Sequence, residues 1–143
     1  MANVLLTGAA GAIAMDLAFS LDMAKINVFA TEADEDNFSL VSKNCKYYNK
    51  VFRAPRAGNE DYINRINEII VNENIDLVLT VCDNAKEICP VFPKETDFFH
   101  YSFEDPADAK GTHKEKLVIY EKVRDEIHNF IKSEFIDIIN NKT

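Results

Sequence analysis

Two kinds of apolar pattern alternate along the chain. Short runs of mostly branched apolar residues predict strands, and a run that is apolar at nearly every position is typical of a strand buried on both faces of a parallel sheet. These runs occupy residues 4–7, 26–31, 50–54 and 75–83, and an alternating run follows at residues 97–103. Apolar residues at intervals of three or four predict helices over residues 11–23, 34–44, 61–72 and 112–139.

The order of these elements is βαβαβαβαβα if residues 84–90, which end at Pro90, form one or two helical turns. Strands that alternate with helices form a parallel sheet with right-handed crossovers and helices on both faces. Pro55 stops the third strand and cannot donate a ladder hydrogen bond, so this strand is expected at a sheet edge. With no repeat or linker, residues 1–143 predict a single α/β domain.

Capping residues mark two helix starts. Thr112 and Glu115 have the spacing of a capping box, and Asp34 or Asp36 is expected to cap the helix over residues 34–44. The helix that follows Thr112 carries apolar residues on one face: Tyr120, Val123, Ile127, Phe130, Ile131, Phe135 and Ile138.

The charge of the chain is acidic and evenly spread. The net charge is −8, and residues 1–80 and 81–143 carry −4 each. This excludes the basic face that nucleic acids or an anionic membrane surface need. No apolar run approaches the roughly 20 residues of a membrane helix, and the start of the chain lacks the basic region of a signal peptide. Three cysteines are an odd number, so a reducing cytoplasm is expected.

The candidate phosphate-binding segment is the loop Gly8-Ala9-Ala10-Gly11-Ala12-Ile13 after the first strand. Glycines at such a junction let the backbone approach a phosphate at the helix N-terminus. A dinucleotide, with Glu32 on a ribose hydroxyl, is one interpretation; an anion or nucleotide bound weakly is another. The third small position of the dinucleotide fingerprint is Ala14, so a simple tight turn is favoured and no cofactor is expected.

The three histidines do not indicate a metal site. His100 is expected to be half-buried on a strand, and His113 and His128 to face solvent on the last helix. Their spacing suits no metal, so no metal is predicted, and no partner is required.

Residues 80–143 resemble the thioredoxin-coupled arsenate reductases, which share the fold of low-molecular-weight tyrosine phosphatases. The matching segments are Val81–Pro93, His100–Ala107, Gly111–Thr112, Lys116–Leu117 and Val123–Ile127. The resemblance implies that Cys82 and Cys89 are the two resolving cysteines and Asp105 the acid of the catalytic loop. Whether Cys82 and Cys89 close a disulfide stays open, because a helix over residues 84–88 would keep their Cα atoms beyond roughly 7 Å. Cys45 is expected to be a helix-face or semi-buried cysteine and not a third partner of this pair.

Residues 1–79 resemble a different family, the Rossmann-like domain that precedes the ATP-grasp fold in carbamoyl-phosphate-synthase-like ligases. The matching segments are Val4–Gly11, Val51–Arg56, Asp61–Ile63 and Ile75–Leu77. Together the two resemblances imply a three-layer, doubly wound sandwich with a five-stranded parallel sheet in the order 3-2-1-4-5, Rossmann-like or flavodoxin-like.

The arsenate reductase family needs a Cys-x5-Arg loop after the first strand, and residues 7–14 contain neither Cys nor Arg. The interpretation is therefore an engineered chimera of the halves 1–79 and 80–143, an α/β scaffold that is not an enzyme. In it, Cys82, Cys89 and Asp105 are vestigial catalytic candidates. A natural fusion and a diverged reductase homologue are the alternative origins. The alternatives are an arsenate reductase-like thiol redox protein that uses Cys82 and Cys89, and a phosphate- or nucleotide-binding module.

Overall fold

The computed structural model describes residues 2–8, 11–80, 96–101 and 103–141. Its strands are β1 (Asn3–Thr7), β2 (Asn27–Glu32), β3 (Lys50–Arg53), β4 (Leu77–Thr80) and β5 (Asp97–His100). Its helices are α1 (Ala12–Met23), α2 (Glu35–Asn44), α3 (Tyr62–Asn72), α5 (His113–Phe130) and α6 (Ile136–Asn140), with η1 (Pro106–Asp108) and η2 (Ile131–Phe135) as short helical segments.

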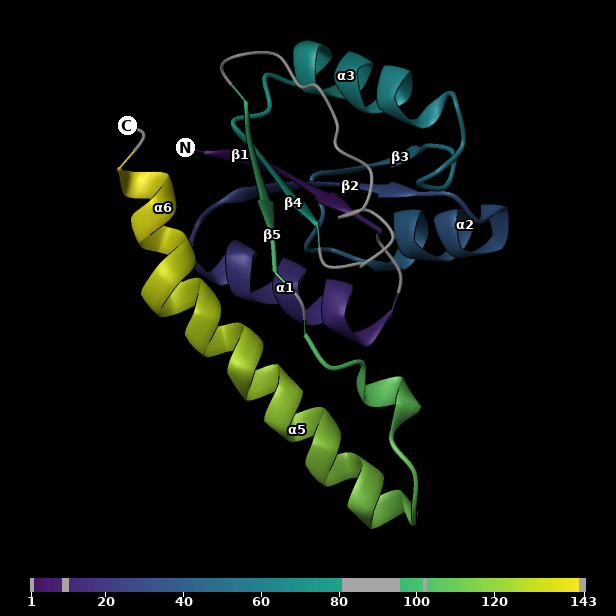
Figure 1. The fold of residues 1–143 in the computed structure, drawn as a ribbon, viewed down its shortest axis with the longest axis vertical. Coiled ribbons are helices and arrows are strands. Elements are labelled where there is room, and N and C mark those ends of the chain that lie inside the picture. The colour runs from purple at the N-terminus through teal and green to yellow at the C-terminus, as the bar shows by residue number, and fades with distance from the viewer. Residues whose placement is uncertain (1, 9–10, 81–95, 102, 142–143) are drawn as a thin grey trace.

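The five strands form one parallel sheet in the order β3-β2-β1-β4-β5 (Figure 1). Val4 of β1 pairs with Val28 of β2 on one side and with Leu77 of β4 on the other. The order 3-2-1-4-5, the Rossmann-like α/β class and the edge position of β3 are therefore confirmed.

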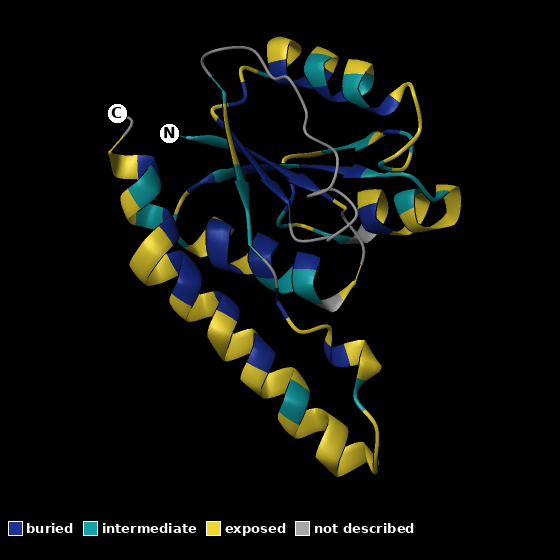
Figure 2. Cartoon of the chain, viewed as in Figure 1, coloured by how far each residue is buried: buried dark blue, intermediate teal, exposed yellow. Residues whose placement is uncertain are grey.

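Each face of the sheet packs on its own set of helices. On one face, Leu5 and Val78 pack with Ile66 and Ile69 of α3. The other face carries the larger cluster, in which Leu6 packs with residues of α1, α2 and α5. Figure 1 shows α3 on one side of the sheet and α1, α2 and α5 on the other, and Figure 2 shows the strands β1 and β4 buried between them.

Side-chain caps start two helices as predicted. Asp34 accepts a hydrogen bond from the backbone N–H of Asn37 at 2.9 Å, so Asp34, and not Asp36, caps α2. Thr112 and Glu115 form the reciprocal capping box of α5, with bonds of 3.2 Å and 3.1 Å. Each cap satisfies backbone donors that the first turn of a helix leaves free.

The C-terminal helix differs from the single helix expected over residues 112–139. After Phe130 the chain makes a π-helical segment, η2, before α6 begins. Apart from Phe130, its buried residues recur every four positions: Val123, Ile127, Ile131, Phe135 and Ile139. A spacing of four drifts around an α-helix of 3.6 residues per turn, and the wider π turn brings these residues back to one face. Tyr120 is therefore 38% exposed and Ile139, not Ile138, is the buried residue near the end.

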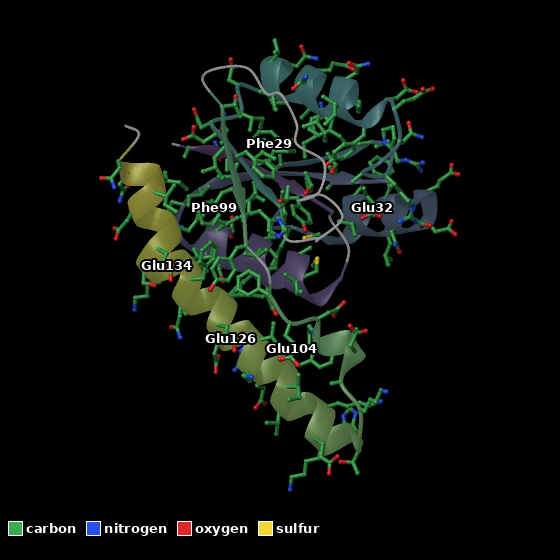
Figure 3. The ribbon with its side chains drawn as sticks, viewed as in Figure 1. Phe29, Glu32, Phe99, Glu104, Glu126 and Glu134 are labelled. Carbon is green, nitrogen blue, oxygen red and sulfur yellow. The ribbon has the colours of Figure 1, made fainter. Side chains whose placement is uncertain are left out.

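The fifth strand is shorter than the expected run over residues 97–103. It ends at His100, and one bond beyond it runs from the N–H of Tyr101 to the carbonyl of Thr80 at 3.0 Å. Phe99 and Tyr101 instead join an aromatic cluster with Phe130, at centroid distances of 5.9 Å and 4.2 Å, which fixes β5 on the C-terminal helix (Figure 3).

The end of the central strand and the turns expected over residues 84–90 lie outside the described residues. Within the described chain, none of the helices has the length and apolar character needed to cross a bilayer.

Candidate functional site

Three neighbouring strands carry a threonine at or near their carboxyl ends. Thr7 pairs with Thr31, and the register of β1 with β4 continues from Leu6 and Leu79 towards Thr7 and Thr80. Because side chains alternate along a strand, these threonines lie on the same face as Leu5, the face covered by α3. Thr7, Thr31 and Thr80, here called the threonine row, are 8%, 4% and 1% exposed.

The members of the threonine row differ in their partners. Thr80 Oγ1 and His100 Nδ1 share a hydrogen bond of 2.7 Å. The backbone N–H of Gly8 donates to the carbonyl of Thr31 at 3.0 Å and also lies 3.4 Å from Thr31 Oγ1. Thr7 Oγ1 is buried and has no hydrogen-bond partner within the described residues. An unpaired buried hydroxyl costs about 1–3 kcal/mol, so an acceptor or donor supplied by a ligand at this edge would relieve that cost.

The glycine loop, residues 8–13, leaves β1 directly beside the threonine row. Gly8 has φ 89° and Gly11 has φ 104°, both in the region that glycine adopts without strain. A Cβ atom added at either position would meet no atom within 4 Å, so the backbone conformation, and not lack of space, requires glycine. Ala9 and Ala10, two of the predicted phosphate-binding residues, lie outside the described residues.

The start of α1 completes the features of an anion site at this loop. The N-cap is Gly11, no side chain caps the helix, and the first turn contains no acidic residue. The backbone N–H groups of Ala12 and Ile13 are therefore available to an anion, and the helix dipole favours negative charge at this end. The loop supplies donors but no charged side chain.

Two residues near the loop have structural roles. The hydroxyl of Tyr48 donates to the carbonyl of Ala14 at 3.4 Å, and burial, together with Cys45 and Glu32 nearby, raises the pKa of Tyr48. Tyr48 therefore stays neutral and holds the first turn of α1. Glu32, the predicted ribose ligand, accepts the backbone N–H of Asp34 at 3.2 Å; Figure 3 shows it near α2.

Of the three residues that the reductase resemblance singles out, only Asp105 lies within the described residues. Cys82 and Cys89 lie outside the described residues. Asp105 is exposed and accepts the N–H of Ala107 at 2.9 Å, which starts η1. The neighbouring Glu104 lies 3.9 Å from Lys122 Nζ, so this loop packs along α5 (Figure 3). In Figure 1, η1 and the start of α1 lie on the same side of the molecule.

The three histidines lie where the sequence predicts them. His100 is partly buried on β5, whereas His113 and His128 are exposed on α5. Cys45 is a free, half-buried cysteine at the end of α2. No group of three His, Cys, Asp or Glu residues within the described chain could hold a metal ion.

Sequence reasoning missed the threonine row. The sequence contains a signal for it, because three of the predicted strands each carry a threonine at or near their carboxyl end. Only the parallel register shows that these hydroxyls lie on one face and at one edge.

The strand order and the helices on both faces define a Rossmann-like α/β protein, with a glycine-containing turn between β1 and α1. Gre2 from Candida albicans superimposes with a TM-score of 0.55 at 12% identity, over 94% of this chain and 53% of that one. A putative NAD-dependent epimerase/dehydratase from Bacillus halodurans gives 0.50 at 14% identity, over 89% and 64%. At these identities the likeness concerns the fold. No family model matches the sequence.

The sequence comparisons give higher identities than the structural ones. Arsenate reductase from Bacillus subtilis is 41% identical over 75 residues, which are 50% of this chain and 54% of that protein. Arsenate reductase from Halalkalibacterium halodurans is 43% identical over 61 residues, 43% of this chain and 44% of that protein, so the chain spans about half the length of these two relatives. Arsenate reductase from Bacillus cereus is 32% identical over 103 residues, 68% of this chain and 72% of that protein. The chain belongs to the arsenate reductase family.

This relationship corrects two predictions. The chain was expected to be an engineered scaffold without native activity, and not an enzyme; relatives named arsenate reductase contradict both statements. The error came from treating the missing loop thiol as the loss of all chemistry. Cys82 and Cys89 are themselves a potential dithiol, which the scaffold interpretation set aside. The comparisons do not confirm an ATP-grasp-type origin of residues 1–79.

Proposed function

We propose that the chain is an arsenate reductase-like thiol redox protein that uses Cys82 and Cys89. The observation that supports the proposal most is the match to proteins named arsenate reductase at 41% and 43% identity. The cytoplasm predicted from the cysteine number suits this chemistry, because reducing compartments keep thiols available.

The oxyanion site of the proposal is the glycine loop. Arsenate, like phosphate, presents several acceptor oxygens, which suit the backbone N–H groups at the start of α1 and the hydroxyl of Thr7, which has no partner in the described part of the chain. Cys82 follows Thr80 by two residues, and Thr80 ends the strand that pairs with β1. The connection from β4 therefore starts beside the strand from which the glycine loop begins.

The redox balance needs both cysteines. Reduction of arsenate to arsenite takes two electrons, and conversion of two thiols to a disulfide supplies two electrons and two protons, with one oxygen released as water. Since the glycine loop has no thiol, one of Cys82 and Cys89 attacks the arsenic as a thiolate and the other displaces it by closing the disulfide. Asp105 is the proposed proton donor to the departing oxygen. A thioredoxin-class dithiol then returns the pair to the reduced state.

Arsenate-dependent turnover coupled to thioredoxin, thioredoxin reductase and NADPH tests this proposal. The wild-type chain is expected to consume NADPH well above a control without protein, and Cys82→Ser and Cys89→Ser to reduce this rate to the control level. Cys45→Ser is the matched control, because Cys45 lies at the end of α2 and the variant is expected to retain full turnover. Loss of turnover in Cys45→Ser alone, or no turnover in the wild type, would contradict the proposal.

A second candidate function is phosphate or nucleotide binding without redox chemistry, favoured by the two positive-φ glycines of the loop. It fits the proposed origin of residues 1–79 as a Rossmann-like domain distinct from residues 80–143. Thermal unfolding with millimolar NAD, NADP or ATP tests it: an increase in the unfolding temperature supports nucleotide binding, and no shift leaves the loop as an oxyanion site or a tight turn.

A further inference from the structure

Three of the four arginines of the chain line one surface groove. The groove has a volume of about 460 Å³ and is lined by Ala33, Arg53, Ala54, Pro55, Arg56, Asp61 and Arg65. We call it the arginine groove. In a chain of net charge −8, a wall with three guanidinium groups and one carboxylate is a local exception that favours an anion.

The arginine groove lies beyond the carboxyl ends of β2 and β3, the side of an open α/β sheet on which ligands bind. The N–H of Ala54 donates to the carbonyl of Glu32 at 3.3 Å, which ties the end of β3 to β2. In the sheet order, β3 is separated from β1 by β2, two strand spacings of about 5 Å each. The groove is therefore distinct from the glycine loop.

One wall of the groove is held in place by Arg65. Its Nε donates to the carbonyl of Arg53 at 2.9 Å, and its guanidinium carbon lies 5.7 Å from the ring centroid of Phe52. One terminal nitrogen lies 3.2 Å from Glu68 on the next turn of α3. The side chain of Arg65 is 31% exposed, so it lines the groove as a fixed group.

The other two guanidinium groups remain available to a ligand. The Arg53 guanidinium lies 5.9 Å over the ring of Phe38, a contact that leaves its N–H groups free to donate. Arg56 is exposed, and within the described part of the chain no ion pair or hydrogen bond engages its guanidinium. Two free guanidinium groups beside one fixed group match the several acceptor oxygens of a phosphate.

The size of the groove indicates the rest of the ligand. A volume of about 460 Å³ falls in the range of small-molecule sites and exceeds what a bare oxyanion fills. Ala33, Ala54 and Pro55 give part of the wall an apolar surface. Glu68 already pairs with Arg65, and Asp61 is the one carboxylate of the lining, so the guanidinium groups left for a phosphate are those of Arg53 and Arg56. We propose that the arginine groove binds a small organic phosphate monoester.

Isothermal titration with AMP, ribose 5-phosphate, inorganic phosphate and adenosine tests the proposal on the wild-type chain. Both monoesters are expected to bind at least about tenfold more tightly than adenosine or inorganic phosphate. Arg56→Gln and Arg53→Gln are each expected to weaken AMP binding about tenfold, the factor for one hydrogen bond to a charged group. Arg124→Gln, the fourth arginine, is the matched control and is expected to bind AMP as the wild type does.

Amide NMR spectra locate the bound AMP and keep the test independent of redox activity. Shifts at residues 53, 54, 56 and 65, retained in Cys82→Ser, support the arginine groove. Shifts confined to Gly8, Gly11 and Ile13 assign the phosphate to the glycine loop and overturn the proposal. Equal AMP affinity in Arg56→Gln, in a variant with an unchanged unfolding temperature, overturns it as well, and so does inorganic phosphate binding as tightly as AMP.

Discussion

The glycine loop and the arginine groove lie at the same carboxyl edge of one sheet but offer an anion different groups. The loop presents backbone N–H groups and the hydroxyl of Thr7, and its donors carry no net charge. The groove presents the guanidinium groups of Arg53, Arg56 and Arg65.

The difference follows from position in the sheet. The loop continues from β1, a central strand with neighbours on both sides, whereas the groove is built on β3, the edge strand, and on the exposed side of α3. A central site receives its geometry from the packed core and its donors from the main chain. An edge site is not surrounded by the packed core, and its donors are long charged side chains that keep contact with water.

The largest expected effect is on stability, and it compares β1, which leads into the glycine loop, with β3, which borders the arginine groove. Leu5 of β1 is 0% exposed, so Leu5→Ala is expected to lower the free energy of unfolding by about 2–5 kcal/mol. Phe52 of β3 is only partly buried, and Phe52→Ala is expected to cost clearly less although it removes a larger side chain. Urea titrations of both variants measure this; an equal loss would mean that the edge strand is as deeply embedded as the centre.

The next prediction concerns Thr7, the buried hydroxyl beside the glycine loop. Thr7→Val replaces a hydroxyl that has no partner among the described residues by a methyl group. It is expected to raise the free energy of unfolding by about 1 kcal/mol, because a buried polar group without a partner is destabilising. If the hydroxyl contacts the oxyanion, the KM for arsenate rises at the same time. A more stable protein with an unchanged KM would leave Thr7 out of the site. AMP binding at the arginine groove should not change.

Much of the fold could be predicted from local patterns and from resemblance. Resemblance predicted the strand order. Pro55 predicted the edge position of β3, and the pair Thr112 and Glu115 predicted the start of α5. The π turn after Phe130 could not, because a spacing of four is compatible with a continuous helix until its drift against the sheet is known. The end of β5 at His100 depends on its partner strand and on the aromatic cluster of Phe99 and Tyr101.

The sites show a similar division. Gly8 and Gly11 could be recognised because a strand–glycine–helix junction is local in sequence. The threonine row and the arginine groove could not, because Thr7, Thr31 and Thr80, or Arg53 and Arg65, come together only through strand register and helix placement. The prediction of an inactive protein was wrong for another reason: an absent Cys-x5-Arg loop does not exclude chemistry by other cysteines.

A smaller effect tests the rigidity of the arginine groove. Arg65→Lys keeps the charge but loses the Nε donor to the carbonyl of Arg53. We expect a loss of about 1 kcal/mol in the free energy of unfolding, the usual contribution of one hydrogen bond, and weaker AMP binding. Urea titration and calorimetry measure the two effects. Arsenate turnover, which depends on the other region, is expected to stay at the wild-type level; a parallel loss of turnover would mean that the two regions are coupled.

The smallest effect lies in α1, the helix that begins at the glycine loop. Burial raises the pKa of Asp16 above the ordinary 3.8, and Arg124 partly opposes this shift. The folded state therefore binds more protons than the unfolded state just above pH 3.8, so the free energy of unfolding decreases as pH rises through that interval.

Asp16→Asn removes this contribution, and we expect its unfolding free energy to lose less on going from about pH 4 to pH 7 than that of the wild type. Asp22→Asn, an exposed change on the same helix, serves as the control for the loss of one carboxylate from α1. Urea titrations across the pH series measure the slopes. AMP binding has its own pH dependence, because a phosphate monoester loses its second proton at about pH 6. Binding is therefore compared at about pH 7 only, where AMP should bind Asp16→Asn as tightly as the wild type; a changed affinity would show that charge near the glycine loop is felt at the arginine groove.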